Sequence, residues 1–400
     1  MTTLFQKGFK LKAEVAPELA RSYHSSLVAR IRDLGYAVRA GDITIRLARE
    51  FGFCYGVDRA VEYAYEARAK FPDRAIFLCG EIIHNADVNG RLERMGIRIL
   101  SEAASPKERY ADIGPSDVVL LPAFGVTVPE LEHLQAKGCV LVDTTCGSVM
   151  TVWKNVHRYA REGFTSVIHG KYYHEETKAT ASQALTHEGG HFICVRDPAE
   201  AELVCSSIRG ELGKNVLEEQ LGPGMSPGFD PQRDLERVGL ANQTTMLMSE
   251  SLEVQRLLRD AMTERYGEAA LEERFRAFDT ICSATQDRQD AVLALLESGA
   301  LDTMLVIGGY NSSNTMALAR ICSERVPTYH IESPECLERT HVRHQALASK
   351  QPSTAADWLP EGPVCVGLTA GASTPDRLVG EAIERLLALR GASVEQLEAV

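Results

Sequence analysis

The chain has 400 residues, with 43 basic against 55 acidic side chains and a formal net charge of −12. At roughly 100–200 residues per domain, this length predicts two or three packed units. No run approaches the ~20 apolar residues that span a bilayer, and residues 1–50 lack the apolar core of a secretory signal. A net acidic chain has no global attraction for nucleic acid. We therefore expect a soluble, cytoplasmic protein that binds neither membranes nor nucleic acid.

Short apolar runs alternate with amphipathic helical stretches, which predicts an α/β fold with parallel sheets. Residues 1–45 form a mixed-charge segment of helix and extended chain. The predicted strands are Ala75–Gly80, Asp117–Pro122, Val140–Asp143, Thr165–His169, Phe192–Val195, Thr303–Gly308 and Val364–Leu368. The predicted helices are Val57–Lys70, Ser148–Arg161, Glu250–Tyr266, Thr285–Glu297, Ser313–Arg325 and Pro375–Leu389.

Two polar stretches interrupt this alternation. Residues 206–238 contain Gly222-Pro223-Gly224 and Pro227-Gly228, and such punctuation stops regular elements. We interpret this stretch as an insertion or a long surface connection. Residues 349–362 are predicted to be a similar loop before the last strand.

Ten cysteines are spread along the chain, and none forms a CxxC pair. This spacing argues against zinc ribbons and thioredoxin-like sites. A free cysteine is among the most buried residue types, so each one is by default a small hydrophobic residue of the core. The cysteines stand at positions 54, 79, 139, 146, 194, 205, 282, 322, 336 and 365.

An internal repeat singles out three of them. Asp143-Thr-Thr-Cys146 recurs as Asp279-Thr-Ile-Cys282, and Cys54 has a similar context. After each cysteine the pattern predicts a helix, a strand and a polar loop. The spacings are 30 residues from Cys54 to His84, 28 from Cys146 to His174 and 30 from Cys282 to Ser312. Ligands bind at the carboxyl ends of parallel strands, so three such units predict one site with three thiols.

Three cysteines from three loops indicate a metal centre. Catalytic zinc keeps three protein ligands and one open position. An iron–sulfur cubane with three cysteine ligands would likewise leave one iron open, whereas fully ligated clusters use four cysteines. Three buried turn cysteines without a metal are the remaining alternative.

The polar loops offer donors suited to phosphate oxygens. The helix that follows Ser312 begins near Ser313 and Asn314, and Ser373 precedes Pro375 at another predicted helix start. Helix N-termini present free N–H groups to anions. His84 and His174 add imidazole donors. No phosphate-binding GxxxxGK[ST] motif occurs.

Glu176 lies two residues after His174 in the same loop. A carboxyl in a partly dry site could deliver protons near neutral pH. The local sequence Glu175-Glu176-Thr177-Lys178, taken alone, favours a solvated residue at a helix start.

Together these segments resemble the 4-hydroxy-3-methylbut-2-enyl diphosphate reductase family. The resemblance runs in order over about residues 45–390, and residues 1–45 and 206–238 are similar to the family's longer form. It is carried by Gly52-Phe-Cys-Tyr-Gly-Val-Asp-Arg-Ala60, Glu81-Ile-Ile-His-Asn85, Asp143-Thr-Thr-Cys146, His169-Gly-Lys-Tyr-Tyr-His-Glu-Glu176, Asn242-Gln-Thr-Thr245, Asp279-Thr-Ile-Cys282, Thr285-Gln-Asp-Arg-Gln289, Asn311-Ser-Ser-Asn314 and Thr369-Ala-Gly-Ala-Ser-Thr-Pro-Asp376.

The resemblance implies three pseudo-threefold-related α/β domains with small, mostly parallel sheets around a central [4Fe–4S] cluster. We place an N-terminal extension at 1–45, a first domain at 46–145, a second at 146–281 with the insertion 206–238, a third at 282–365, and a closing segment at 366–400.

It also implies the site. Cys54, Cys146 and Cys282 would hold the cluster, and Glu176 would donate protons. The substrate-binding residues would be His84, His174, Thr244, Ser312, Ser313, Asn314 and Ser373. Many members carry an Ala-His-Gly motif where this chain has Ala123-Phe124-Gly125, and Phe124 cannot donate to a phosphate.

The implied reaction is the last step of the non-mevalonate isoprenoid pathway. At the open iron of the cluster, the allylic hydroxyl of (E)-4-hydroxy-3-methylbut-2-enyl diphosphate leaves as water, and isopentenyl and dimethylallyl diphosphate form. The sequence has no GxGxxG dinucleotide fingerprint, so we expect electrons from a carrier such as a ferredoxin or flavodoxin. The alternatives are a three-domain iron–sulfur enzyme of the quinolinate synthase type, a non-catalytic iron–sulfur redox sensor and a zinc-stabilised binding protein.

Overall fold

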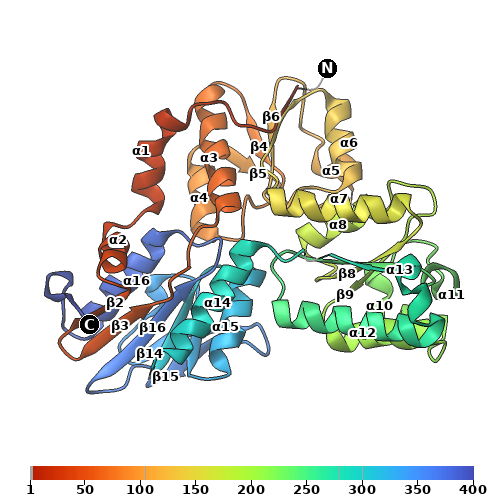
Figure 1. The fold of residues 1–400 in the computed structure, drawn as a ribbon. Helices are drawn as coiled ribbons and strands as arrows, with labels where there is room; N and C mark the ends of the chain where they lie inside the picture. The colour runs from red at the N-terminus through yellow and green to blue at the C-terminus, as the bar shows by residue number, and fades with distance from the viewer. Residues whose placement is uncertain (1–2, 104, 279, 300) are drawn as a thin grey trace. The chain divides into compact units, whose positions relative to one another are not determined.

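The structure is a computed structural model that describes residues 3–103, 105–278, 280–299 and 301–400. Its contacts divide the chain into two units. Unit 1 comprises residues 1–7, 73–82 and 98–282, and unit 2 comprises residues 8–72, 83–97 and 283–400. Each unit is built from α/β elements, shown as ribbons in Figure 1.

Unit 1 contains two small sheets. The first has the order β1-β7-β6-β4-β5, in which β1 pairs with β7, β7 with β6 and β6 with β4, all in parallel. The second has the order β11-β10-β8-β9 and is parallel throughout. The strands are β1 (Thr3–Phe5), β4 (Ile76–Leu78), β5 (Ile97–Ile99), β6 (Val118–Leu121), β7 (Val140–Asp143), β8 (Thr165–His169), β9 (Phe192–Val195), β10 (Val238–Asn242) and β11 (Phe275–Ala277).

Helices cover the second sheet of unit 1 on both sides. In Figure 1, α7 and α8 lie on one side of β8 and β9, and α12 lies on the other, where it packs against α9. The helices of unit 1 are α5 (Pro106–Arg109), α6 (Val128–Lys137), α7 (Gly147–Arg161), α8 (Glu175–Ala184), α9 (Pro198–Arg209), α10 (Lys214–Leu221), α11 (Pro231–Asp234), α12 (Met248–Tyr266) and α13 (Leu271–Arg274), with 3-10 turns η1 (Gly222–Gly224) and η2 (Glu268–Ala270).

Unit 2 is built on one eight-stranded sheet of order β15-β14-β13-β12-β16-β3-β2-β17. Its centre, β13-β12-β16-β3, is parallel, and its edges are antiparallel. The strands are β2 (Ala37–Ala40), β3 (Ile43–Leu47), β12 (Thr303–Ile307), β13 (Thr328–Ile331), β14 (His341–Gln345), β15 (Pro352–Ala356), β16 (Val364–Ala370) and β17 (Glu398–Ala399).

The helices of unit 2 include two from the N-terminal segment, and α1 packs on α3 while α2 packs on α16. The helices are α1 (Lys12–Tyr23), α2 (Ser26–Asp33), α3 (Tyr55–Lys70), α4 (Ala86–Arg94), α14 (Ser283–Glu297), α15 (Ser313–Ser323) and α16 (Asp376–Leu389), with 3-10 turns η3 (Pro334–Cys336) and η4 (Val394–Gln396).

The expected α/β class is confirmed, and the two sheets of unit 1 are small and mostly parallel, whereas the eight-stranded sheet of unit 2 has a parallel centre and antiparallel edges. Strands β7, β8 and β9 have the predicted bounds. All residues of β6, β8 and β12 are buried, which explains the apolar runs Val118–Leu121 and Met304–Ile307 in β6 and β12. The predicted domain limits stay predictions, and the limit at 365/366 falls inside β16.

The predictions of a long surface connection at 206–238 and of a loop at 349–362 are wrong, while the insertion at 206–238 stays a prediction. The stretch 206–238 contains α10, η1 and α11, and its residues Leu217, Leu221, Phe229 and Leu235 belong to the core of the second sheet of unit 1. Its Gly-Pro punctuation therefore separates short packed helices. The stretch 349–362 includes β15, which pairs with β14 along five residues.

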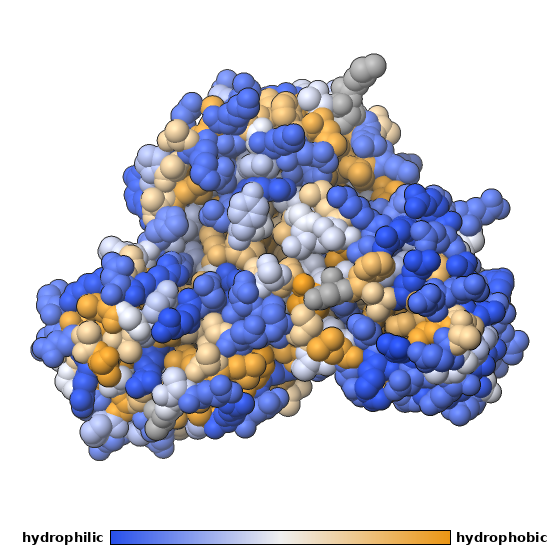
Figure 2. All heavy atoms as spheres, viewed as in Figure 1, coloured by the Kyte–Doolittle hydropathy of each residue, from blue (hydrophilic) through white to orange (hydrophobic). Residues whose placement is uncertain are grey.

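Hydrophilic side chains dominate the face shown in Figure 2, with hydrophobic ones in small groups among them. Among the residues that the structure describes, no helix is both long and apolar enough to cross a membrane.

Candidate active site

The three predicted metal-ligating cysteines all stand at helix starts. Cys54 immediately precedes α3, Cys146 precedes α7 and Cys282 precedes α14. Cys54 and Cys146 are N-cap residues with extended backbone. All three are partly exposed. The thiolate is the form of cysteine that binds metal.

The main chain holds these three cysteines in the same way. Each cysteine follows a strand, and its N–H donates to a carbonyl in the loop that follows the neighbouring parallel strand. The bonds are Cys54 N–H to Ala372 O (3.1 Å), Cys146 N–H to Ala123 O (3.0 Å) and Cys282 N–H to Thr244 O (3.3 Å). The repeat predicted from sequence spacing therefore has a matching backbone geometry. Asp279, which belongs to the sequence repeat, lies outside the described residues.

The other cysteines differ in exposure. Six of the seven are buried, as predicted, whereas Cys365 is half-buried, contrary to the prediction. Burial raises the pKa of the thiols of Cys79, Cys194, Cys205 and Cys322 to about 12. Such thiols stay protonated and are poor metal ligands. The accessible thiols of Cys54, Cys146 and Cys282 therefore fit a thiolate-bound cluster better than the buried ones do.

In unit 1, the loop after β8 leads to His174, the N-cap of α8. The His174 Nδ1 atom accepts the N–H of Glu176 at 3.1 Å. Because Nδ1 accepts, the proton of a neutral ring lies on Nε2. His174 is 7% exposed. The ring therefore presents a donor nitrogen, as expected of a residue that binds phosphate oxygens.

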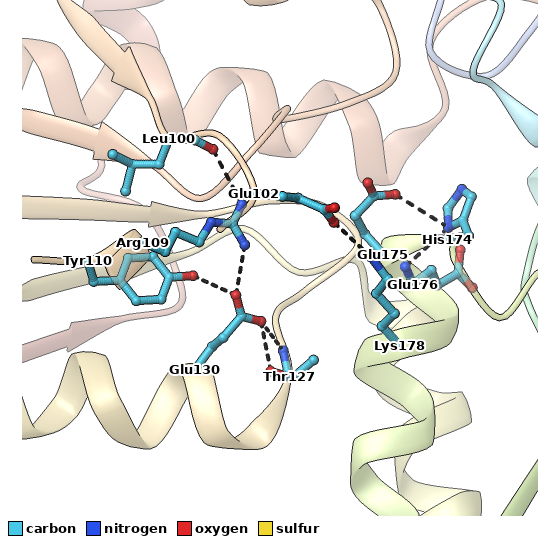
Figure 3. Close-up of polar contacts among 10 residues, drawn as sticks. All are labelled: Leu100, Glu102, Arg109, Tyr110, Thr127, Glu130, His174, Glu175, Glu176 and Lys178. Carbon is cyan, nitrogen blue, oxygen red and sulfur yellow. Dashed lines mark hydrogen bonds and ion pairs between the residues drawn. The ribbon is translucent and has the colours of Figure 1, made fainter. Parts of the chain in front are cut away.

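Glu176 is buried at 2% exposure, in contrast to the solvated helix start that the local sequence favours. Its Oε1 accepts the N–H of Thr244 at 2.6 Å, and the Thr244 carbonyl accepts the N–H of Cys282. A hydrogen-bonded path therefore joins the Glu176 carboxyl to the turn that carries Cys282. Figure 3 shows Glu176 at the start of α8 beside His174.

Gln243 is a residue of this region to which the sequence assigned no role. It is 1% exposed, and its Oε1 accepts the N–H of Lys171 and the hydroxyl of Thr177, both at 3.2 Å. It thereby braces the loop before His174 against the loop that holds Thr244. Its place in the Asn242-Gln-Thr-Thr245 segment was the only signal.

Phe124 lies against His174, with ring centroids 5.7 Å apart and an interplanar angle of 81°. This edge-to-face contact is a favourable aromatic geometry. The departure from the Ala-His-Gly motif therefore replaces a donor with an apolar contact to a predicted substrate-binding histidine.

The loop after Phe124 is held by a partly buried network (Figure 3). Glu130 accepts from the backbone and hydroxyl of Thr127, and also from Arg109 and Tyr110. Burial raises the pKa of the Glu130 carboxyl, but these hydrogen bonds and the Arg109 charge outweigh it, so that the pKa lies below its usual value. Glu130 therefore stays ionised and caps α6.

In unit 2, the start of α15 carries Ser312, Ser313 and Asn314, all buried. The Ser312 hydroxyl accepts the N–H of Thr315 at 3.2 Å. Asn314 Oδ1 accepts the N–H of Ala372 at 2.9 Å, and this bond fixes the carboxamide. Asn314 Nδ2 is buried and has no hydrogen-bond partner among the described residues. An unpaired buried donor costs about 1–3 kcal/mol, which a bound anion would offset.

His84 and Ser373 lie at the same place in unit 2. The Ser373 hydroxyl donates to the His84 carbonyl at 3.1 Å. A Cβ at Gly309 would collide with the same carbonyl oxygen, so the loop before α15 packs directly on this segment. The contacts thus gather His84, Ser373, Asn314 and the Cys54 turn in one unit.

The predicted residues thus fall into two sets. Unit 1 holds Cys146, Cys282, His174, Glu176 and Thr244, and unit 2 holds the remaining six predicted residues. Polar side chains at the carboxyl ends of small parallel sheets, including a buried carboxyl, are typical of an α/β enzyme.

The particular family follows from sequence comparison. The pattern of the family described as LytB protein matches residues 45–387, and the chain belongs to this family. Three relatives are named 4-hydroxy-3-methylbut-2-enyl diphosphate reductase. The relative from Gloeobacter violaceus is 48% identical over 97% of this chain and 93% of its own length. Those from Nostoc sp. and Thermosynechococcus vestitus are each 46% identical over 96% of this chain and 94% of their own lengths.

Two solved structures agree with this result. One, described as (E)-4-hydroxy-3-methyl-but-2-enyl diphosphate reductase, the terminal enzyme of the non-mevalonate pathway, covers 86% of this chain and 98% of its own, with 28% identity and a TM-score of 0.52. The other, the E-1-hydroxy-2-methyl-but-2-enyl-4-diphosphate reductase from Plasmodium falciparum, covers 86% of this chain and 87% of its own. At 21% identity and a TM-score of 0.62 it supports the fold alone. The expected family and oxidoreductase class are therefore confirmed.

Proposed function

We propose that this chain reduces (E)-4-hydroxy-3-methylbut-2-enyl diphosphate to isopentenyl and dimethylallyl diphosphate in isoprenoid biosynthesis. The relatives' names support the substrate class. The observation that carries the proposal is the path from the buried Glu176 carboxyl through Thr244 to the Cys282 turn. That path ties a proton-bearing group to a thiol suited to bind metal.

Cys54, Cys146 and Cys282 would hold a [4Fe–4S] cluster, with no cysteine for its fourth iron. When bound, the cluster supplies the two electrons and the Lewis-acid iron that removal of an allylic hydroxyl requires. The protein's part is to orient the substrate, exclude water and move protons. Electrons would come from a protein carrier such as a ferredoxin or flavodoxin.

The diphosphate would be held by the substrate-binding residues predicted from the sequence. Asn314 Nδ2, the hydroxyls of Ser312, Ser313 and Ser373, and the His84 ring supply neutral donors in unit 2. In unit 1, His174 supplies its Nε2–H and Thr244 its hydroxyl. Hydrogen bonds to a charged acceptor are about twice as strong as neutral ones, so this set can bind an anion although the chain's net charge is −12.

Glu176 would deliver the proton with which the hydroxyl leaves as water. The Thr244 N–H fixes one carboxyl oxygen, and the short link to α8 keeps the group in place. A second proton, added at either end of the allyl unit, gives the two products. The two electrons and two protons balance the loss of water.

The direct test is turnover of the allylic diphosphate by the anaerobically purified protein with a chemical reductant. We expect isopentenyl and dimethylallyl diphosphate as products. Conversion of iminoaspartate in place of the diphosphate would instead identify an enzyme of the quinolinate synthase type. A cluster-loaded protein without turnover of either substrate would indicate a redox sensor.

The cluster ligands have a separate test. Cys54→Ser, Cys146→Ser and Cys282→Ser should each lose most of the iron and sulfide found in the parent protein. Cys365→Ser is the matched control, because Cys365 has similar partial exposure but lies outside the repeat. Full iron and sulfide content in all three ligand variants would refute the assignment.

A further inference from the structure

The loop between β12 and α15 contacts a buried histidine, His330, to which the proposed function gives no role. His330 lies on β13, which pairs with β12 in parallel, and the residue is fully buried. Its Nε2 lies 2.9 Å from the carbonyl oxygen of Gly308, the first residue of the loop. A carbonyl can only accept, so Nε2 carries the proton and donates.

The state of this ring is fixed by its surroundings. Burial lowers the pKa of His330 to about 4, and the Gly308 bond and the nearby His344 shift it less. The ring is therefore neutral at physiological pH, with its single proton on Nε2. His330 Nδ1 has no partner in the part of the chain that the structure describes. The hydrogen bond to Gly308 thus offsets part of the free-energy cost of burying the polar imidazole ring.

A second contact ties the same ring to the loop. Tyr310 lies edge-on to His330, with ring centroids 5.2 Å apart and an interplanar angle of 85°. The Tyr310 hydroxyl lies 3.9 Å from Cys336 Sγ. One imidazole therefore contacts the loop at Gly308 and again two residues later.

Two further contacts hold the loop. Gly309 packs against the His84 carbonyl, and the Gly308 N–H donates to the carbonyl oxygen of Ile331, the residue after His330 on β13, at 2.9 Å. Ser312 follows two residues after Tyr310 and caps α15. A displacement at Gly308 or Tyr310 therefore moves the start of α15, where the buried donors lie.

We propose that His330 is a positioning residue for substrate binding, because it fixes the Gly308–Tyr310 segment. That segment in turn positions the hydrogen-bond donors proposed to bind the diphosphate, which are Ser312, Ser313 and Asn314. This inference rests on the proposed function, in which those donors bind the diphosphate. His330 itself does not contact the substrate. Its effect is expected on binding and KM, with little effect on kcat.

The test compares two substitutions at His330 in the cluster-loaded protein. His330→Gln keeps a side-chain N–H that can reach Gly308, whereas His330→Leu removes the donor. The probe is inorganic pyrophosphate, measured by calorimetry under anaerobic conditions. We expect His330→Leu to weaken pyrophosphate binding about tenfold and to raise KM for the allylic diphosphate similarly, with kcat within about threefold of the parent. His330→Gln should restore most of the affinity.

Two further variants separate positioning from general loss of structure. Tyr310→Ala removes the ring contact at a half-exposed position and should also weaken binding, whereas Tyr310→Phe should not. His344→Gln is the matched control, because His344 contacts Tyr329 on the neighbouring strand and not the loop. If His330→Leu does not fold, a parent-like affinity in Tyr310→Ala would overturn the inference.

Asn314→Asp distinguishes failure of this inference from failure of the proposed function. If Asn314→Asp does not weaken pyrophosphate binding, the assignment of the anion donors is wrong. If it weakens binding but His330→Leu binds like the parent, the anion site stands and the role of His330 is refuted. Equal loss of affinity in His330→Leu and His330→Gln would also refute the donor-based mechanism.

Discussion

The starts of α8 and α15 present two kinds of polar site within one chain. At α8, hydrogen bonds within the chain fix both side chains: His174 accepts from the Glu176 N–H, and the Glu176 carboxyl accepts from the Thr244 N–H. At α15, Asn314 is fixed through its oxygen but its buried nitrogen has no partner among the described residues. The first arrangement fixes the carboxyl that we propose as the proton donor, and the second has a buried donor that we propose for the substrate. The predictions below test that difference, from the largest expected effect to the smallest.

Glu176→Gln tests the proton donor that we propose at α8. The carboxamide oxygen can still accept the Thr244 N–H, so the position is kept while the acid is lost. General acid catalysis is worth about 10²–10⁴-fold, and we expect a kcat loss of that size with KM and iron content little changed. Anaerobic steady-state kinetics and iron quantitation measure this. A raised KM at parent-like kcat would place Glu176 among the binding residues and break the comparison.

Each unit has a buried, neutral histidine close to its candidate site residues. His169 is the last residue of β8 in unit 1, and His330 lies on β13 in unit 2. Burial lowers the pKa of both to about 4. Between pH ~6.5 and ~4 the unfolded state binds a proton that the folded state does not, so stability falls as pH falls, by at most ~3 kcal/mol per histidine. Denaturant unfolding at pH 7 and pH 4.5 should show a smaller difference in His169→Gln and in His330→Gln than in the parent. An unchanged difference would mean that the histidine is protonated in the folded protein.

Asn314→Asp tests the open donor at α15. The substitution keeps an oxygen that can accept from Ala372 and replaces the unpaired donor with a negative charge. We expect KM for the diphosphate to rise about 10–100-fold, equivalent to ~1.4–2.8 kcal/mol, with a smaller change in kcat. A kcat loss like that of Glu176→Gln, at unchanged KM, would contradict the proposal that α8 carries the proton donor and α15 binds the substrate.

Arg32→Met tests how far the support of the unit 2 site extends. Arg32 on α2 donates to both oxygens of Asp376, at 2.7 and 3.3 Å, and stacks on Phe51. Asp376 and Phe51 flank the segments that carry Ser373 and Cys54. The pair is partly exposed, so we expect a stability loss of only about 1 kcal/mol, with faster alkylation of Cys54 in the metal-free protein. Arg30→Met, on the same helix but bonded to the backbone of Val394 and Leu397, should leave alkylation unchanged.

The strands and helices that were predicted from the sequence lie close to their predicted bounds, because their signals are local. Strands such as Thr165–His169 are continuous buried runs, and the helices have an apolar face. The prediction for 206–238 was wrong because it followed the Gly and Pro residues. It did not use the apolar residues of this stretch that belong to a core, which are Leu217, Leu221, Phe229 and Leu235.

The sequence indicated candidate site residues but not the contacts that they make. The repeat singled out Cys54, Cys146 and Cys282, but the bonds of their amides depend on which strands are neighbours. The burial of Glu176 and the contacts of Gln243 depend on the loop after β10, in which Thr244 is 68 residues away from Glu176 along the chain. Contacts between residues so far apart in the chain cannot be predicted from the sequence of a short segment.

The pairing of β3 with β16 at the centre of the large sheet has a consequence for synthesis. Ile43 on β3 is paired with Val364 on β16. The apolar strand β3 is therefore synthesised about 320 residues before the strand with which it pairs. At roughly 5–20 residues per second, translation takes tens of seconds to supply that partner. Throughout that time Ile43, Ile45 and Leu47, buried in the finished protein, lack their final cover. The nascent chain is therefore expected to depend on chaperones more than a protein of the same size whose sheets close in sequence order.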